Sequence, residues 1–271
     1  MRLGLIGFPV GHSLSPAMHE AALRAAGLEG SYQALETPPA FLHARLLEVR
    51  RGFAGVNVTI PHKESVLEYL DEISPEAKAI GAVNTIVCDQ GRLIGYNTDA
   101  LGFIYALDEA GIAYRNKKAL ILGAGGAARA IAYALKEAGA RVAVYNRTRE
   151  RAMALCEAMG LQLISEPLLA TEVLGCDLLI NTTSVGLKDP GSSPLPPGLL
   201  PQAGVVVDIV YSPPTTRLLH EAREAGRVTL GGLPMLVWQG ALAFELWTGI
   251  KPDVQVMYAA ARAGLQNLSS L

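Results

Sequence analysis

The 271-residue sequence has few cysteines and no long uninterrupted apolar run. Its three cysteines, Cys88, Cys156 and Cys176, lie far apart, which argues against a disulfide framework or a zinc site and favours a reducing compartment. No stretch approaches the roughly 20 apolar residues that span a bilayer, and the N-terminal apolar run is too short for a signal peptide. We therefore expect a cytoplasmic protein with no bound metal.

Charges are also scarce and nearly balanced. Charged residues make up 18% of the chain, and the formal net charge is −2. This composition gives no reason to expect a nucleic-acid or membrane partner, so the expected partner is a small-molecule substrate. With 50% hydrophobic residues, the chain is long enough for two domains that each bury a core. The sequence leaves open whether the protein is a monomer or a homodimer.

Short apolar segments alternate with amphipathic stretches, which is typical of an α/β fold with βα units around a mostly parallel sheet. After a polar break at residues 115–118, a second set of strands begins. The last two helices, 233–248 and 254–265, have no strands of their own and are expected to pack back on the first domain. The expected strands are residues 3–7, 31–36, 55–59, 82–88, 92–96, 119–122, 141–145, 178–181 and 205–208.

Two polar residues stand where predicted helices begin. Ser15 precedes Pro16, and this pair suits the N-cap and first position of a helix through about residue 26. Asp99 is likewise placed to cap a helix that runs to about residue 110. Either residue can therefore serve the helix, a binding site, or both.

A glycine-rich turn at residues 123–128 fits the pattern G-x-G-x-x-A between a predicted strand and a predicted helix. This context is the one that a dinucleotide-binding turn requires, with phosphates at the positive end of the helix. A tight turn without a ligand is the alternative. The candidate cofactor residues in this turn are Gly123, Ala124, Gly125, Gly126 and Ala127.

The next strand indicates which dinucleotide is bound. It is followed by Asn146, Arg147 and Thr148, where an NAD site usually has an acidic residue for the ribose hydroxyl. An arginine instead binds a 2′-phosphate, so the sequence favours NADP over NAD. Arg151 is a second candidate for the phosphate, or a charge on the helix surface. The alternative is a solvated basic turn capped by Thr148.

Several longer motifs resemble those of the shikimate dehydrogenase family, in the family's order and over nearly the whole chain. Residues 7–16 (GFPVGHSLSP) resemble its substrate loop, and residues 57–63 (NVTIPHK) resemble its catalytic-lysine motif. Four further blocks match at residues 81–85, 97–99, 181–186 and 231–239. The resemblance implies a discontinuous substrate domain, residues 1–100 plus 238–271, and a Rossmann-type cofactor domain, residues 101–237.

The resemblance also implies roles for individual residues. Lys63 and Asp99 would form the acid-base pair of an NADP-dependent reduction of 3-dehydroshikimate to shikimate. Ile209 and Gly232 of the second domain would complete the cofactor site. The implied substrate-binding residues are Ser13, Ser15, Thr59, Asn84, Asp99, Tyr211 and Gln239.

Two rival functions remain open from sequence. One is a quinate/shikimate dehydrogenase that uses NAD, against which Asn146 and Arg147 argue. The other is a non-catalytic NADP-binding sensor, which has no reason to keep Lys63 and Asp99 beside a carboxylate pocket.

Overall fold

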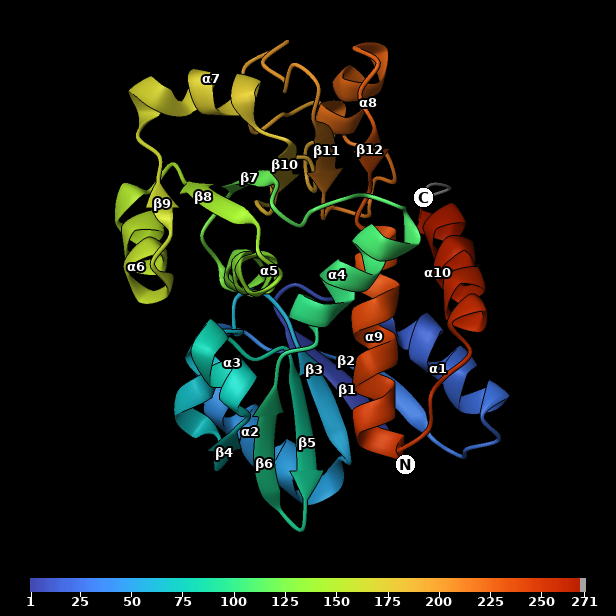
Figure 1. Ribbon diagram of the computed structural model, residues 1–271. Helices are drawn as coiled ribbons and strands as arrows, with labels where there is room; N and C mark the ends of the chain where they lie inside the picture. Colours follow the sequence, from blue (N-terminus) through green and yellow to red (C-terminus); the bar gives the residue numbers. More distant parts are fainter. Residues whose placement is uncertain (269–271) are drawn as a thin grey trace. The chain divides into compact units, whose positions relative to one another are not determined.

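The computed structural model describes residues 1–268 and divides them into two compact units (Figure 1). The first unit consists of Met1–Gly102 together with the segment from Val237 onward, and the second is Phe103–Leu236. The last three residues of the expected range 238–271 lie outside the described residues. The division does not show which ligand each unit binds, so the assignment of one unit to the substrate and the other to the cofactor remains a prediction.

The first unit is built on a mixed six-stranded sheet with the strand order β2-β1-β3-β5-β6-β4. β1 pairs in parallel with β2 and β3, whereas β3, β5 and β6 pair antiparallel. The β5–β6 pair is the expected pair of strands around a turn. The strands are β1 (Arg2–Gly7), β2 (Ser31–Glu36), β3 (Gly55–Val58), β4 (Glu72–Ile73), β5 (Thr85–Asp89) and β6 (Arg92–Tyr96).

Helices of the first unit come from both ends of the chain, and α1 packs beside α10. The last two helices therefore do pack on the N-terminal sheet unit, as the sequence predicted. After Pro61, the structure has the 3₁₀ helix η2 (Ser65–Tyr69). The others are α1 (Ser15–Ala25), η1 (Pro39–Phe41), α2 (Leu42–Gly52), α3 (Pro75–Ile80) and α10 (Val254–Leu268). Two further helices, α4 (Asp99–Glu109) and α9 (Leu233–Thr248), belong to this unit only in part, because the unit boundaries fall within them, after Gly102 and before Val237.

The hydrophobic core of the first unit lies between the sheet and α2. Alternate side chains of β1 and β3 point to this face, including Ile6, Val56 and Val58, and they pack on Leu46 and Val49 of the helix. Leu46 and Val49 are three residues apart, so they lie on one stripe of α2. This packing holds the strand ends, where the polar residues lie, in a fixed register.

The second unit is an all-parallel sheet with the order β12-β11-β10-β7-β8-β9, so the predicted α/β class with a Rossmann-type unit is confirmed. Its central strands are buried apolar runs, as expected for strands covered on both faces. The elements are β7 (Lys118–Leu122), α5 (Gly126–Glu137), β8 (Arg141–Tyr145), α6 (Arg149–Met159), β9 (Gln162–Leu163), α7 (Glu166–Gly175), β10 (Leu178–Asn181), β11 (Val205–Asp208), α8 (Arg217–Glu224) and β12 (Thr229–Leu230).

Among the described residues, no helix combines the length and the apolar character needed to cross a membrane. The three cysteines are free thiols, and burial raises the pKa of Cys156 to about 11 and that of Cys176 to about 12. Both thiols are therefore protonated at neutral pH and behave as small core side chains.

Candidate active site

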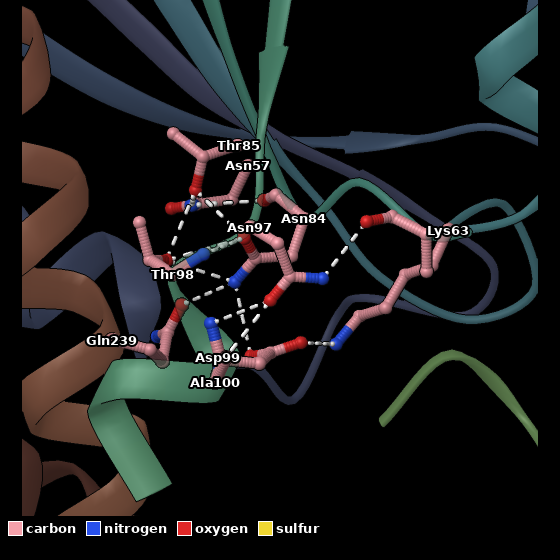
Figure 2. A network of polar contacts seen from close by, with 10 residues as sticks. Asn57, Lys63, Asn84, Thr85, Asn97, Thr98, Asp99, Ala100 and Gln239 are labelled. Carbon is pink, nitrogen blue, oxygen red and sulfur yellow. Dashed lines mark hydrogen bonds and ion pairs between the residues drawn. The ribbon is translucent and has the colours of Figure 1, made fainter. Parts of the chain in front are cut away.

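Polar residues converge at one edge of the first unit's sheet. The parallel strands β1 and β3 end at this edge, and β6 ends there too, because Tyr96 pairs with Thr85, which in turn pairs with Asn57. The loops that follow β1, β3 and β6 therefore meet at the same place as the start of β5. These four segments contain most of the candidate substrate-binding residues, and Figure 2 shows the side chains that gather there.

Lys63 and Asp99 form a close ion pair at this edge. The Lys63 Nζ lies 2.6 Å from Asp99 Oδ2, and their side chains are 15% and 5% exposed. The backbone around Lys63 is fixed, because its carbonyl accepts a hydrogen bond from the Val83 N–H and the neighbouring buried His62 bonds the Thr37 carbonyl. The ammonium group is thus held in one position while keeping some access to solvent.

Asn97, rather than Asp99, accepts hydrogen bonds from the N–H groups at the start of α4. Asn97 Oδ1 accepts hydrogen bonds from the N–H groups of Asp99 and Ala100, at 3.0 and 3.3 Å, and Asp99 is itself the first helical residue. The expected cap at Asp99 is therefore wrong, because the residue two positions earlier satisfies the helix donors. Both carboxylate oxygens of Asp99 are left for side chains.

Asn84 links Asp99 to the rest of the network. Its Nδ2 lies 3.0 Å from Asp99 Oδ1, 2.9 Å from Thr98 Oγ1 and 3.3 Å from Gln239 Oε1. The Thr98 N–H donates to Asn84 Oδ1 at 2.7 Å. Asp99 thus receives Lys63 on one oxygen and Asn84 on the other, and the structure brings four predicted site residues, Lys63, Asn84, Asp99 and Gln239, into one cluster.

Gln239 reaches this cluster because α4 and α9 approach closely. A Cβ at Gly102 in α4 would lie 2.8 Å from the backbone nitrogen of Gln239, so a side chain at Gly102 would push the helices apart. Gln239 is buried. Asn84 and Gln239, which are 155 positions apart in sequence, therefore share one hydrogen-bond network.

Ser13 and Ser15 lie at the beginning of α1. The structure makes Leu14 the N-cap, with Ser15 as the first helical residue, so the expected N-cap role of Ser15 is wrong. Ser13 Oγ accepts from the Ser15 N–H at 3.2 Å. Thr59 directly follows β3. These three residues lie on the loops of the same sheet edge, and their contacts with a substrate remain predictions.

The glycine-rich turn of the second unit has the geometry that a dinucleotide turn needs. Gly123 follows β7 with φ +118°, and a Cβ there would lie 2.4 Å from Thr182 Oγ1, so only glycine fits. Among the described residues, no atom lies within 4 Å of a Cβ built at Gly125, so the backbone is open at the start of α5. Ala124 is buried, whereas Gly126 and Ala127 are half-buried in the first turn of the helix. The turn can thus accept a pyrophosphate at a helix N-terminus.

The candidate phosphate-binding residues lie at the end of β8. Asn146 Nδ2 donates to the Thr148 carbonyl at 2.8 Å, which shapes the turn into α6. Arg147, Thr148 and Arg151 are exposed. The two guanidinium groups are therefore open to an anion, as the NADP hypothesis requires, and their binding role stays a prediction.

The remaining candidates of the second unit follow β11. The Gly232 N–H donates to the Val210 carbonyl at 3.2 Å, which places Gly232 beside Ile209. Tyr211 lies in the same segment and is half-buried. Tyr211 belongs to the second unit, and its expected contact with the substrate remains a prediction.

A buried carboxylate in the second unit escaped the sequence analysis. Asp208 is fully buried at the end of β11 and accepts hydrogen bonds from Thr216 Oγ1 at 2.7 Å, Asn181 Nδ2 at 3.0 Å and the Val210 N–H at 3.1 Å. Burial raises the pKa of Asp208, although these hydrogen bonds oppose the shift. An Asp at a strand end is a common loop residue, so no sequence signal separates it from a turn.

Within residues 1–268, no group of three or more His, Cys, Asp and Glu side chains is placed to hold a metal ion.

Family models match three segments of the chain. Residues 5–86 match the shikimate dehydrogenase substrate binding domain, residues 106–186 match shikimate / quinate 5-dehydrogenase, and residues 232–262 match the shikimate 5′-dehydrogenase C-terminal domain.

Individual relatives cover nearly the whole length. A shikimate dehydrogenase (NADP(+)) of one Thermus thermophilus strain is 56% identical over 98% of this chain and 99% of its own. The crystal structure of shikimate 5-dehydrogenase from a second strain of Thermus thermophilus, in complex with NADP(H) and shikimate, superposes with a TM-score of 0.92 at 54% identity, over 98% of this chain and 100% of that one. The Aquifex aeolicus shikimate dehydrogenase structure gives a TM-score of 0.91 at 42% identity, over 97% of each chain. With such identity along almost its full length, this chain belongs to the shikimate dehydrogenase family.

Proposed function

We propose that the protein catalyses the reversible, NADPH-dependent reduction of 3-dehydroshikimate to shikimate. The observation that carries this proposal is the buried cluster in which Lys63 Nζ lies 2.6 Å from Asp99 Oδ2 and Asn84 donates to Asp99 Oδ1. Relatives of this chain bear that activity in their names, and one relative's crystal structure contains both NADP(H) and shikimate.

The residues of the second unit fit a dinucleotide. Gly123 and Gly125 leave the turn before α5 free of side chains, and Arg147 offers an exposed guanidinium where a carboxylate would repel a 2′-phosphate. When bound, the nicotinamide supplies or accepts the hydride. All other steps fall to groups of the protein.

Lys63 handles the proton. In the reductive direction, a Lys63 Nζ–H donates to the substrate carbonyl oxygen as this oxygen becomes an alkoxide, and in the oxidative direction the Nζ accepts the hydroxyl proton. Asp99 Oδ2 holds the ammonium in place, and Asp99 also accepts a hydrogen bond from a substrate hydroxyl. The exposure of Lys63 lets the ammonium regain its proton from solvent.

Asn84, Gln239 and Thr59 complete the binding of the substrate's hydroxyl groups in this proposal, and Ser13 and Ser15 hold its carboxylate. Ser13, Thr59 and Asn84 lie in the loops at one sheet edge, Ser15 begins α1 beside them, and Gln239 reaches Asn84 from α9. Tyr211 would help to orient the substrate from the second unit.

The test is turnover, followed through the absorbance of the reduced nicotinamide. Four pairs are offered to the purified protein: shikimate or quinate, each with NADP or NAD. Fast turnover with shikimate and NADP, and little with the other pairs, supports the proposal. Preference for quinate and NAD would instead assign the protein to the broader quinate/shikimate dehydrogenases. Absence of turnover with every pair, despite NADPH binding, would favour a sensor.

A further inference from the structure

Thr85 is the first residue of β5 and has a hydroxyl group that lies inside the network without being exposed. Its side chain is fully buried, with 0% relative exposure. The hydroxyl lies 3.1 Å from Asn57 Nδ2 on β3, 3.1 Å from Asn84 Oδ1 and 3.1 Å from Thr98 Oγ1. Thr85 therefore joins the sheet to the cluster around Asp99 and cannot reach a ligand itself.

The direction of these hydrogen bonds follows from Asn57. Asn57 Nδ2 also donates to the Asn84 backbone carbonyl at 3.2 Å, which is an acceptor only, so this end of the amide must be the nitrogen. The Tyr32 hydroxyl then donates to Asn57 Oδ1 at 2.7 Å. At Thr85, the hydroxyl oxygen thus accepts from Asn57, and the hydroxyl donates to Asn84 Oδ1, which can only accept.

The orientation of the Asn84 amide decides whether its nitrogen or its oxygen faces Asp99 Oδ1. With Oδ1 toward the Thr98 N–H and the Thr85 hydroxyl, Nδ2 faces Asp99 and donates to it. A flipped amide would turn its oxygen toward the carboxylate, and two acceptors would then face each other. The Thr98 N–H and the Thr85 and Thr98 hydroxyls all lie within hydrogen-bond distance of Asn84 Oδ1, and they hold the amide in the donating orientation.

We propose that Thr85 is a positioning residue for the proton transfer. Its hydroxyl holds Asn84 in the orientation that donates to Asp99 Oδ1, and Asp99 in turn holds Lys63 Nζ. The hydrogen bonds from Tyr32 through Asn57, Thr85 and Asn84 all run toward the carboxylate, so each one strengthens the next. This inference rests on the proposed dehydrogenase activity.

The test is a series of three substitutions of this one residue. Thr85→Val keeps the shape and the β-branch but removes the hydroxyl, Thr85→Ser keeps the hydroxyl, and Thr85→Cys replaces it with the weaker hydrogen-bonding thiol. We expect kcat with shikimate and NADP to fall about 10- to 100-fold in the valine variant, because small misplacement of a reacting group costs up to about 10² in rate. The serine variant should recover most of this loss, and the cysteine variant should lie between the two.

A control separates positioning from general destabilisation. Ser74 caps α3 through a hydrogen bond from the Ala77 N–H to its Oγ, outside the network around Asp99. Ser74→Ala should lower the unfolding midpoint without changing kcat per folded molecule. NADPH binding, measured by its fluorescence, should be unchanged in all of these variants. In the valine variant, the fold-decrease in kcat should exceed the fold-change in KM.

The outcomes distinguish this inference from the proposed function. A folded Thr85→Val enzyme with wild-type kcat, or a serine variant as slow as the valine variant, overturns the role of Thr85 alone. If the valine variant does not fold, an unchanged kcat in the cysteine variant overturns it equally. Absence of turnover in the wild-type protein overturns the proposed function itself.

Discussion

Among the described residues, each unit has a buried carboxylate at a sheet edge, and the two carboxylates accept hydrogen bonds from different kinds of donor. Asp99 in the first unit is 4% exposed and has an ammonium group on one oxygen and an amide N–H on the other. Asp208 in the second unit is 0% exposed and has only neutral donors, Thr216, Asn181 and a backbone N–H. Burial is therefore not what sets the two apart.

The two carboxylates differ in the group that each one binds. Asp99 holds a charged group that stays partly exposed and can exchange a proton with solvent. Asp208 joins the ends of β10 and β11 to the Thr216 N-cap of α8, so it fixes the course of the loops. Asp99 is therefore the proposed catalytic carboxylate, because a partly exposed cation accompanies it and, within the part of the chain that the structure describes, none accompanies Asp208.

The largest expected effect comes from removing the cation. Lys63→Ala should lower kcat by about 10²–10⁴-fold, the usual contribution of general acid-base catalysis. NADPH binding, measured by fluorescence, should stay close to that of the wild type, because the glycine-rich turn belongs to the other unit. A variant that retains wild-type kcat would contradict the acid-base role of Lys63, and with it the proposed role of Asp99.

Substitution of Asp208 should act on stability instead. Asp208→Ala leaves three buried donors without an acceptor and should lower the free energy of unfolding by about 3 kcal/mol or more, at about 1–3 kcal/mol for each unsatisfied group. Denaturant titration measures this loss.

Asp208→Asn tests the pKa of the same carboxyl. The native state binds the proton more tightly than the unfolded state, because the native pKa is raised above 3.8. The free energy of unfolding of the wild type should therefore fall, relative to the asparagine variant, as pH rises from 3.8 through the native pKa. A pH-independent difference between the two proteins would contradict the raised pKa.

The first unit also buries a titratable side chain that has no charged partner among the described residues, His19. The ring is fully buried and stacks on Tyr32 with a centroid separation of 4.4 Å, and burial lowers its pKa from 6.5 to about 3. Below pH 6.5 the unfolded chain takes up a proton that the native state does not, so stability is lost as pH falls.

His19→Phe keeps an aromatic ring and removes this titration. Over about two pH units below 6.5, the wild type should lose about 2.7 kcal/mol of unfolding free energy relative to the variant. Parallel stability–pH curves for the two proteins would refute the prediction.

The smallest effect is expected from substitution of the exposed Arg147. Arg147→Ala should raise the KM for NADP about tenfold, equivalent to about 1.4 kcal/mol, because a solvated guanidinium contributes less than a buried one. The KM for NAD, which has no 2′-phosphate, serves as the control and should not change. An equal effect on both cofactors would point to a general electrostatic role of this turn.

The sequence predicted the long elements well, because their apolar patterns are strong. The strands β2, β6, β8, β10 and β11 and the helix α9 have the expected bounds. The two-residue strands β4, β9 and β12 were not predicted, since two residues carry no periodicity. The family resemblance named Lys63, Asn84, Asp99 and Gln239, which the structure brings together.

What the sequence could not supply is the direction of each side chain. Ser15 and Asp99 are good N-cap types, yet at the first position the structure places the N-cap at Leu14, and at the second the side chain of Asn97 accepts from the helix N–H groups. The contact between Asn57 and Thr85 depends on antiparallel register, which a single sequence does not fix.

The discontinuity of the first unit has a consequence for synthesis on the ribosome. Chains emerge from the N-terminus, but the first unit is finished only by α9 and α10. α9 brings Gln239 to Asn84, and its Trp247 indole N–H donates to the Ile86 carbonyl at 3.0 Å. The second unit is continuous and is complete once residue 236 has left the ribosome. The half of the protein that is made first is thus the half completed last, and a chain broken off at residue 236 holds both Lys63 and Asp99 without the helix that closes their network.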